Sequence, residues 1–436
     1  MVASARVVRT VARTWTSVSG ADRAGRHADP GTIGTVTYHL SHDPGVEPNA
    51  LWSVWCRRCS MRLSVLRGLA GRWLVAAGLV AVLTLAACGG GGGAGSTTRS
   101  AAPSVHPHVG IGDEKLDVFT DARFLALGIK YVRYDMSWDA LSVPWQRPQV
   151  TAWMNAAKAD GMSVLVTIDH SRNTLYKKVV VNGVTKAEAF SQSRMMPTVA
   201  QYVAAFNAFR ARFPWVTEFA TWNETNCYCE VSFNHVPRIA AYYLAVRSAC
   251  STCTILAAEF LDVERSSGVP MTIWAREFVK AAGLQPQYWG LNDYEEANHL
   301  VTTSTRQLLA TVQGTIWLAE TSGIVNRYGI VNPGFPQNAA HAAIVDHYVL
   351  STIGALSPRI QRIYLYEWDA KTPRDGWDTA LISYTGAPRP GYVVLAKTLN
   401  AWGIRPNCAI SRIPPTCTGR DSTATPRTGA TGSTTP

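Results

Sequence analysis

The chain has 436 residues, a formal net charge of +11 and 47% hydrophobic residues. We do not expect the start and the end of a chain of this length to belong to the same compact core. Much of the positive charge lies near the start, because residues 1–87 hold ten arginines and four acidic residues, a net of +6. The remaining +5 is spread over about 350 residues without a Lys/Arg block, which argues against nucleic acid as a partner.

A basic stretch followed by an apolar one begins at Met61. Arginines at 62, 67 and 72 precede an uncharged apolar run over residues 73–87. That run is shorter than the about 20 residues of a membrane-spanning helix, so residues 61–87 are predicted to be a signal peptide. Residues 1–60 contain no clear periodic element. We expect Met61 to be the true start; the alternative is a disordered cytoplasmic extension behind a retained membrane anchor.

The end of the signal sequence has a more specific pattern. Leu85-Ala86-Ala87-Cys88 resembles the bacterial lipobox, in which the signal is removed before a cysteine that bears lipid. Five glycines and a Ser/Thr-rich stretch follow, so residues 88–105 are predicted to be a flexible tether. We therefore expect an extracytoplasmic lipoprotein attached to the bacterial membrane through Cys88. The alternative is an ordinary secreted protein with a coincidental cysteine.

Residues 106–407 alternate short β-rich runs with longer helical patterns. The strand runs are 108–112, 131–134, 163–168, 218–222, 254–258, 288–292, 315–319 and 362–366, and helical patterns include 197–213, 238–248, 338–351 and 391–399. Eight strand–helix units over about 290 residues predict an α/β fold, a (β/α)₈ TIM barrel that forms one catalytic domain. A doubly wound open sheet is the alternative, but no Gly-x-Gly-x-x-Gly follows the first strand.

Six cysteines follow Cys88, and an even number in an exported chain favours disulfides. We expect Cys250 to pair with Cys253 and Cys408 with Cys417, while a bridge between Cys227 and Cys229 stays open. A four-thiolate zinc site is the alternative for the first four, but about 14 helical residues between the two pairs would hold them about 20 Å apart. No His/Asp/Glu cluster has convincing metal spacing, so no metal and no cofactor are expected. Residues 408–436 are predicted to be a bridged loop and a disordered tail.

Two glutamates end short apolar runs that contain tryptophan, Trp222-Asn223-Glu224 and Trp317-Leu318-Ala319-Glu320. In a TIM barrel the chemistry gathers at the carboxyl ends of the strands, where both glutamates fall. Glycoside hydrolysis requires two carboxyl groups on one face, so the pair predicts this reaction. Four other glutamates lack such a setting, and they are Glu259, Glu295, Glu296 and Glu367. Glu367 is the most credible substitute.

These motifs resemble the retaining glycoside hydrolases of clan A. The stretches 124–134, 213–224, 317–323, 366–368 and 388–392 are similar to uncharacterised secreted glycosyl hydrolases, mainly actinobacterial, and the resemblance spans about residues 106–400. It implies that Glu320 is the nucleophile and that Glu224 is the general acid and then the general base.

The resemblance also implies roles for the residues around the two glutamates. Asn223 would hydrogen-bond the sugar 2-hydroxyl, and Arg133 would hold Glu320 ionised, with Tyr294 as a second partner. Trp368 would be the hydrophobic platform under the sugar. The remaining expected substrate-binding residues are Trp138, His170 and Asn292. His170 has an equal alternative as a hydrogen-bonded histidine at the rim.

Two residues depart from the family pattern. Thr225 stands where such enzymes often have proline, and Asn292 stands where relatives often have histidine.

We expect a retaining hydrolase of poly- or oligosaccharides whose two carboxyl groups lie about 5–5.5 Å apart. The alternatives are an inactive carbohydrate-binding surface protein, which the change at Asn292 favours, and a transglycosylase that uses the same residues.

Overall fold

The computed structural model describes residues 38–39, 106–181, 184–191, 195–263, 267–327 and 333–404. The predicted signal peptide, the tether with Cys88 and the tail with Cys408 and Cys417 lie outside the described residues. So does the N-terminal extension, apart from the two residues of the short strand β1 (Tyr38–His39).

Eight parallel strands close into a barrel in the order β10-β11-β2-β3-β4-β7-β8-β9. The strands are β2 (His108–Gly112), β3 (Tyr131–Ser137), β4 (Ser163–Asp169), β7 (Glu218–Ala220), β8 (Thr254–Leu261), β9 (Tyr288–Asn292), β10 (Thr315–Thr321) and β11 (Ile360–Tyr366). Each predicted strand run overlaps one of them. The predicted TIM barrel is confirmed.

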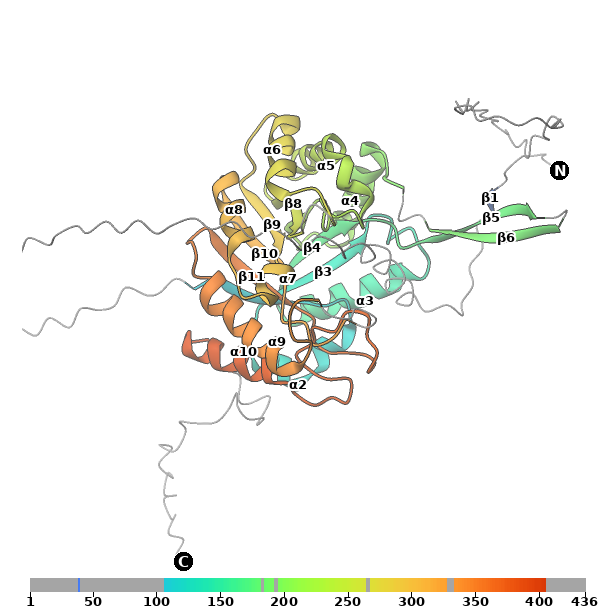
Figure 1. Ribbon diagram of the computed structural model, residues 1–436. Coiled ribbons are helices and arrows are strands. Elements are labelled where there is room, and N and C mark those ends of the chain that lie inside the picture. Colours follow the sequence, from blue (N-terminus) through green and yellow to red (C-terminus); the bar gives the residue numbers. More distant parts are fainter. Residues whose placement is uncertain are drawn as a thin grey trace, which may run out of the picture.

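Helices surround the strands on the outside of the barrel (Figure 1). They are α2 (Ala122–Ala126), α3 (Gln146–Ala159), α4 (Val199–Arg212), α5 (Val236–Ala249), α6 (Met271–Ala282), α7 (Tyr294–Asn298), α8 (Thr303–Thr311), α9 (Ala339–Tyr348) and α10 (Pro390–Ala401). Shorter helical turns are η3 (Leu116–Thr120), η5 (Val231–Asn234) and η6 (Val349–Ile353). The four predicted helical patterns correspond to α4, α5, α9 with η6, and α10.

Local sequence signals fix where several helices begin and end. Thr198 and Gln201 form a reciprocal capping box at the start of α4, which satisfies backbone N–H groups that have no partner inside the helix. The Asn338 side chain accepts two backbone N–H groups at the start of α9. Gly283 ends α6 with a φ of 68°, a left-handed conformation that favours glycine.

The protein has two apolar cores, and an ion pair lies beside the smaller one. The larger core lies between strands and helices, and a second cluster in the barrel interior consists of Leu165, Ala220, Leu256, Trp317, Ala319 and Tyr364. Arg362 lies 4.0 Å above the Trp317 ring and pairs with Glu218, with 2.6 Å between Nη2 and Oε1. Because Glu218 is the first residue of its strand, this pair fills the amino-terminal end of the barrel. The carboxyl-terminal end is left for polar side chains.

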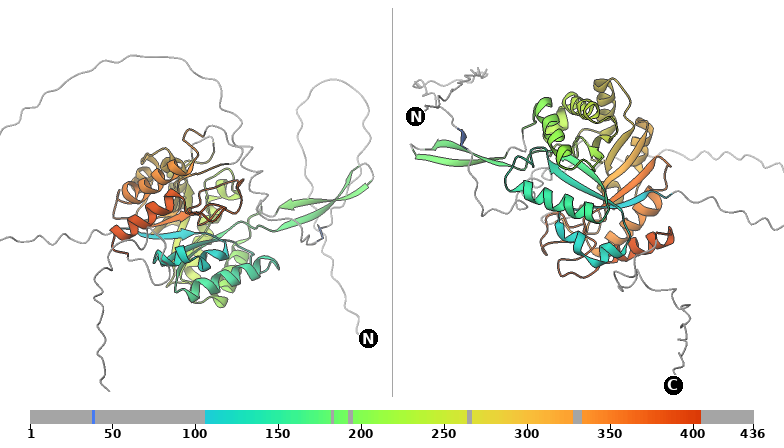
Figure 2. Two further views of the ribbon diagram at one scale, coloured as in Figure 1. Left: turned by 90° about the horizontal axis from the view of Figure 1, so that it is seen from below. Right: turned by 180° about the vertical axis from the view of Figure 1, so that it is seen from behind.

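A two-stranded antiparallel hairpin interrupts the barrel after β4. Its strands are β5 (Thr174–Val181) and β6 (Val184–Ser191), and β1 pairs with β5 to make a three-stranded sheet. The hairpin extends away from the barrel in all three views (Figures 1 and 2). It is absent from the predicted elements, although the Asn-Gly pair at 182–183 is a strong sequence signal for a hairpin.

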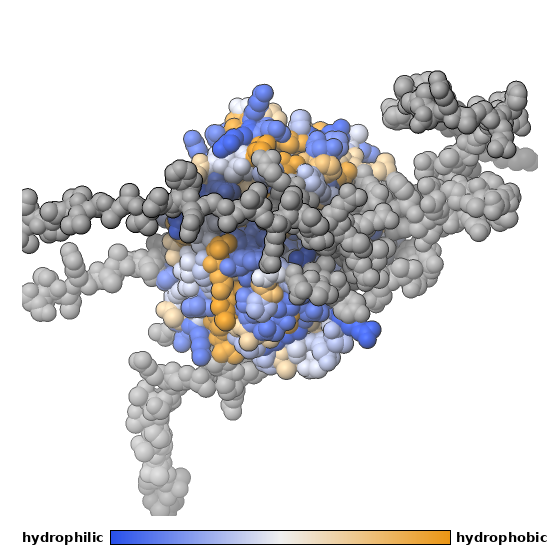
Figure 3. All heavy atoms as spheres, in the orientation of Figure 1, coloured by the Kyte–Doolittle hydropathy of each residue, from blue (hydrophilic) through white to orange (hydrophobic). Residues whose placement is uncertain are grey.

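Among the described residues, no helix combines the length and the apolar character needed to cross a membrane. On the face drawn in Figure 3, hydrophilic residues lie between separate streaks of hydrophobic ones.

Candidate active site

The two glutamates reach the same end of the barrel from strands three positions apart. Glu320 is the sixth residue of β10, and Glu224 follows β7 after the buried Trp222. Glu224 has a φ of 42°, in the left-handed region that costs a non-glycine residue about 1–2 kcal/mol. Such backbone strain persists only where the surroundings hold it, and it clusters at functional sites.

Glu320 has a hydrogen-bond donor on each carboxyl oxygen. Arg133 Nη1 donates to Oε2 over 2.8 Å, and the Tyr294 hydroxyl donates to Oε1 over 2.9 Å. The side chain remains 13% exposed, which leaves it open on one side. Burial raises the pKa of Glu320, while Arg133 and Tyr294 lower it. The predicted contact with Arg133 is therefore present, but burial outweighs its effect and the pKa is not depressed.

Arg133 is a fully buried cation with four polar side-chain partners, one of which is the Thr167 hydroxyl, 3.1 Å from Nε. Besides Glu320 it contacts Glu259, with 2.7 Å between Nη2 and Oε2, and donates from Nη2 to Asn223 Oδ1 over 3.0 Å. Glu259 also accepts the Thr167 hydroxyl over 2.9 Å. Glu259 thus helps to hold the guanidinium in place. Sequence alone did not indicate this role, since the two residues are 126 positions apart.

Asn223 and Asn292 link the two glutamates. Asn223 Oδ1 accepts from both Arg133 and Asn292 Nδ2, the latter over 3.1 Å. Two donors on Oδ1 fix the orientation of the amide, so the Asn223 nitrogen is the group left to donate to a ligand. The Asn292 side chain also favours the charged form of Glu224, because it lowers the pKa of that carboxyl. The residue that departs from the family pattern therefore takes part in the network.

Glu224 lies in a different electrostatic environment. Burial raises the pKa of Glu224 well above its ordinary value, and the carboxylates of Glu320 and Glu230 act in the same direction. No cation is among the principal influences on this group, whereas Glu320 has Arg133. Between the two, Glu320 is the better anion and Glu224 the better proton holder. Two carboxyl groups whose environments separate their pKa values are the arrangement that acid–nucleophile chemistry requires.

His170 lies beside this end of the barrel, in contact with two carboxylates. His170 Nδ1 lies 2.8 Å from Asp169 Oδ2 and 3.1 Å from Glu230 Oε2, and Trp222 Nε1 donates to the same Glu230 oxygen over 3.3 Å. Burial opposes the charged ring, but the two carboxylates together hold the pKa of His170 well above its usual range. Both carboxylates thus contact the same ring nitrogen of His170.

The described residues contain two groupings that bring three metal-ligating atoms together, Asp169/His170/Glu230 and Glu224/Cys227/Cys229. In the first, the contacts of 2.8 and 3.1 Å are hydrogen-bond lengths. Zinc at about 2.0–2.1 Å from each ligand would spread tetrahedral ligand atoms to about 3.3 Å. In the second, both sulfurs belong to a disulfide and are not thiolates. Neither arrangement fits a metal as it stands.

The prediction for Trp368 is wrong. Its side chain is 1% exposed, and it packs edge-on against Phe124 of α2 and Tyr392 of α10. Its Nε1 donates to Asp121 over 3.0 Å. The indole therefore points outward into the helix layer and has no free face for a sugar. Tyr366, the last residue of β11, remains partly exposed. Glu320 is among the carboxylates that raise the pKa of Tyr366, so this residue is a second aromatic near the site, besides Tyr294.

Two aromatic residues lie at the margins of this network. Trp138, directly after β3, is half-buried and packs against the main core, and its backbone N–H donates to Asp169 O over 2.9 Å. Trp377 meets the Tyr294 ring edge-on at 4.9 Å, with Arg327 4.7 Å above its own ring. Trp377 thus supports the tyrosine that donates to Glu320.

Both cysteine pairs among the described residues are disulfides. The predicted Cys250–Cys253 bridge is confirmed, and Cys227–Cys229, which the sequence left open, is bonded as well. The two bridges lie at opposite ends of the barrel. Cys250–Cys253 precedes β8 and borders a surface hollow at the amino-terminal end, while Cys227–Cys229 follows β7 and lies against Glu224.

Comparisons with known proteins identify similar barrels and no sequence family. No protein-family model matches the chain, and no curated protein matches it, so the resemblance drawn from the motifs remains a prediction. Solved structures that resemble it include a family 39 glycoside hydrolase from Bacteroides cellulosilyticus WH2, at 14% identity, a TM-score of 0.43 and coverage of 68% of this chain and 64% of that one.

Two further solved structures are xylanases. Xylanase B from Clostridium stercorarium F9 has 10% identity, a TM-score of 0.48 and coverage of 67% of this chain and 99% of that one. Xylanase 10B from Thermotoga petrophila RKU-1 has 11% identity, a TM-score of 0.47 and coverage of 69% and 95%. These neighbours bear glycosidase names, but at such scores the likeness supports no conclusion about the chemistry of this chain.

Proposed function

We propose that this protein is a retaining O-glycoside hydrolase that acts on a poly- or oligosaccharide by double displacement at Glu224 and Glu320. The observation that supports it best is the difference between the two carboxyl environments. Glu320 has an arginine and a tyrosine hydroxyl as donors, whereas Glu224 is buried among other carboxylates without a cation of its own.

We assign each step of the proposed reaction to a residue of the site. In the first displacement, the Glu224 carboxyl gives its proton to the glycosidic oxygen as the C1–O bond breaks. Glu320 attacks C1 and forms a glycosyl ester. In the second, water attacks C1 while the Glu224 carboxylate takes its proton, and Glu320 leaves. In this proposal Arg133 and Tyr294 stabilise the charge on Glu320 before attack and after release, and the Asn223 amide donates to the sugar 2-hydroxyl.

Replacement of the nucleophile tests this proposal. Glu320→Ala abolishes turnover, and azide restores it with a product of inverted anomeric configuration, because azide attacks C1 from the face that Glu320 occupied. Glu277→Ala, on the exposed face of α6, is the matched control and keeps full activity. Full activity in Glu320→Ala would refute the nucleophile assignment, and an inactive wild-type protein on a broad panel of polysaccharides would refute the function.

A transglycosylase is the nearest alternative, because it would use the same two carboxyl groups. Product analysis in the presence of acceptor sugars separates the two reactions. Net transfer to the acceptor at low donor concentration identifies the transglycosylase, and free sugar identifies the hydrolase.

We further propose that the enzyme is attached to the outer side of the bacterial membrane by lipid at Cys88. The proposal follows from the order of signal peptide, small residues, cysteine and tether in the sequence. Mass spectrometry of the native protein should find an acylated N-terminal Cys88, and Cys88→Ala should release the protein from the membrane fraction. An unmodified N-terminus upstream of residue 88 would contradict the assignment.

A further inference from the structure

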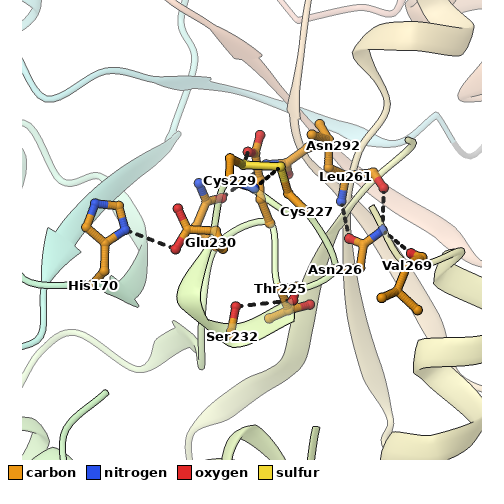
Figure 4. Close-up of a disulfide and its surroundings, with 12 residues drawn as sticks. His170, Thr225, Asn226, Cys227, Cys229, Glu230, Ser232, Leu261, Val269 and Asn292 are labelled. Carbon is orange, nitrogen blue, oxygen red and sulfur yellow. Dashed lines mark hydrogen bonds and ion pairs between the residues drawn. A yellow bond between two sulfur atoms is a disulfide. The ribbon is translucent and has the colours of Figure 1, made fainter. Parts of the chain in front are cut away.

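The segment from Glu224 to Glu230 is a tight loop closed by the Cys227–Cys229 disulfide, which lies directly against the candidate acid. Cys229 Sγ is 3.7 Å from Glu224 Oε2. In Figure 4 the bridge lies between Glu230, which reaches toward His170, and Asn292 on the other side. The disulfide is therefore part of the immediate surroundings of the Glu224 carboxyl.

The same loop holds the Glu224 backbone. The Cys227 N–H donates to the Glu224 carbonyl over 2.9 Å, and the Glu230 N–H donates to the Cys227 carbonyl over 3.1 Å. Glu224 has the left-handed backbone conformation described above, at a φ of 42°. A disulfide between cysteines two positions apart removes conformations that the loop could adopt without the bridge. The cysteine pair thus helps to maintain the strained conformation that directs the Glu224 side chain.

The chemistry of the contact also matters for proton donation. A disulfide sulfur has no hydrogen to donate, so it covers one side of Glu224 Oε2 and keeps water from it without stabilising a negative charge. A free thiol at the same place would be a weak donor and, once ionised, a second anion. The bonded form of the pair is therefore the one that combines a fixed carboxyl with an apolar neighbour.

We propose that the Cys227–Cys229 disulfide is a positioning element for Glu224, so that proton donation to the leaving group depends on this bridge while nucleophilic attack by Glu320 does not. Glu320 takes its donors from Arg133 and Tyr294, on other strands, and these contacts do not pass through the loop. The inference rests on the proposed glycosidase function.

A series of aryl glycosides with different leaving groups separates the two steps. Departure of 2,4-dinitrophenolate needs little help from an acid, whereas departure of phenolate needs full protonation, and general acid catalysis contributes about 10²–10⁴-fold. The variant is Cys227→Ala/Cys229→Ala, and the sugar is the one that the wild type accepts. The control is Cys250→Ala/Cys253→Ala, which removes the bridge at the other end of the barrel.

The variant is expected to lose about 10²-fold or more in kcat/KM on the phenyl glycoside and to stay within about twofold of the wild type on the dinitrophenyl glycoside. The control should change both substrates equally. The inference is overturned if the Cys227/Cys229 variant loses the same activity on both substrates or loses none on either. In that case the glycosidase assignment still stands. A wild type that hydrolyses neither glycoside, nor any other sugar in the panel, refutes the proposed function itself and the inference with it.

A second measurement keeps the test decisive if the double variant does not fold. Folded wild-type protein is treated with dithiothreitol, which gives two electrons and two protons to the disulfide and is itself oxidised to a cyclic disulfide. The ratio of the two rates is compared before and after treatment, and the Cys250→Ala/Cys253→Ala variant is treated in the same way. A drop confined to the phenyl glycoside in both proteins supports the inference, and an unchanged ratio overturns it.

Discussion

The hydroxyl of Tyr294 offers the cleanest probe of the charge on Glu320. Tyr294→Phe removes the 2.9 Å donor to Oε1 and keeps the ring that meets Trp377 edge-on. Arg133 remains on Oε2. Because a donor to a carboxylate favours its charged form, the pKa of Glu320 must rise when the hydroxyl is lost.

The size of the rise follows from the strength of the bond. A hydrogen bond to a charged group contributes about 1.5–3 kcal/mol, and one pKa unit corresponds to about 1.4 kcal/mol. The expected increase is therefore about 1–2 units. The lower end is favoured because Arg133 still opposes protonation.

The assay is the pH dependence of kcat/KM on an aryl glycoside. Its acidic limb reports ionisation of the nucleophile, so that limb should move to higher pH by about 1–2 units in Tyr294→Phe. Tyr242→Phe is the control, because that buried hydroxyl donates to the Pro197 carbonyl and contacts neither glutamate. An acidic limb that does not move, or one that moves equally in the control, would show that Tyr294 does not act on Glu320.

Two further predictions concern stability. Trp368→Ala should lower the free energy of unfolding by about 3–5 kcal/mol, because it empties a core position; unchanged stability with a raised KM would instead identify Trp368 as a sugar platform. Burial raises the pKa of Asp346 to about 7. Above about pH 4 the unfolded chain therefore releases a proton that the folded protein keeps, and the free energy of unfolding falls as the pH rises toward 7. Asp346→Asn retains the oxygen that accepts from Ser322 and Gly323, and urea unfolding should show that it loses less stability than the wild type between pH 5 and pH 8. A larger loss in the variant would contradict this reasoning.

The barrel was predictable because its strands are buried on both sides. The clearest of them form a continuous apolar run that ends at a glutamate, as in β8 and β10. The two glutamates could be located for the same reason, since each ends such a run. The β5–β6 hairpin belongs to no strand–helix unit, and only its Asn-Gly pair marked it.

The contacts within the site were harder to predict because they join residues far apart in the chain. Arg133 and Glu259 are separated by 126 positions, and His170 and Glu230 by 60, so spacing carries no sign of either pair. Trp368 was placed on the wrong side because strand position does not tell which way a side chain turns after the strand ends. Its backbone N–H donates to Asp113, and this bond helps to direct the indole toward the helices.

Covalent capture of the intermediate tests the central claim most directly. A 2-deoxy-2-fluoro glycoside with a dinitrophenolate leaving group slows the second displacement, so the glycosyl ester accumulates and can be found by peptide mass spectrometry. A single fluoroglycosyl label is expected on Glu320 and should be absent from Glu320→Ala. A label on Glu224, Glu259 or Glu367, or turnover with inversion and no label, would contradict it.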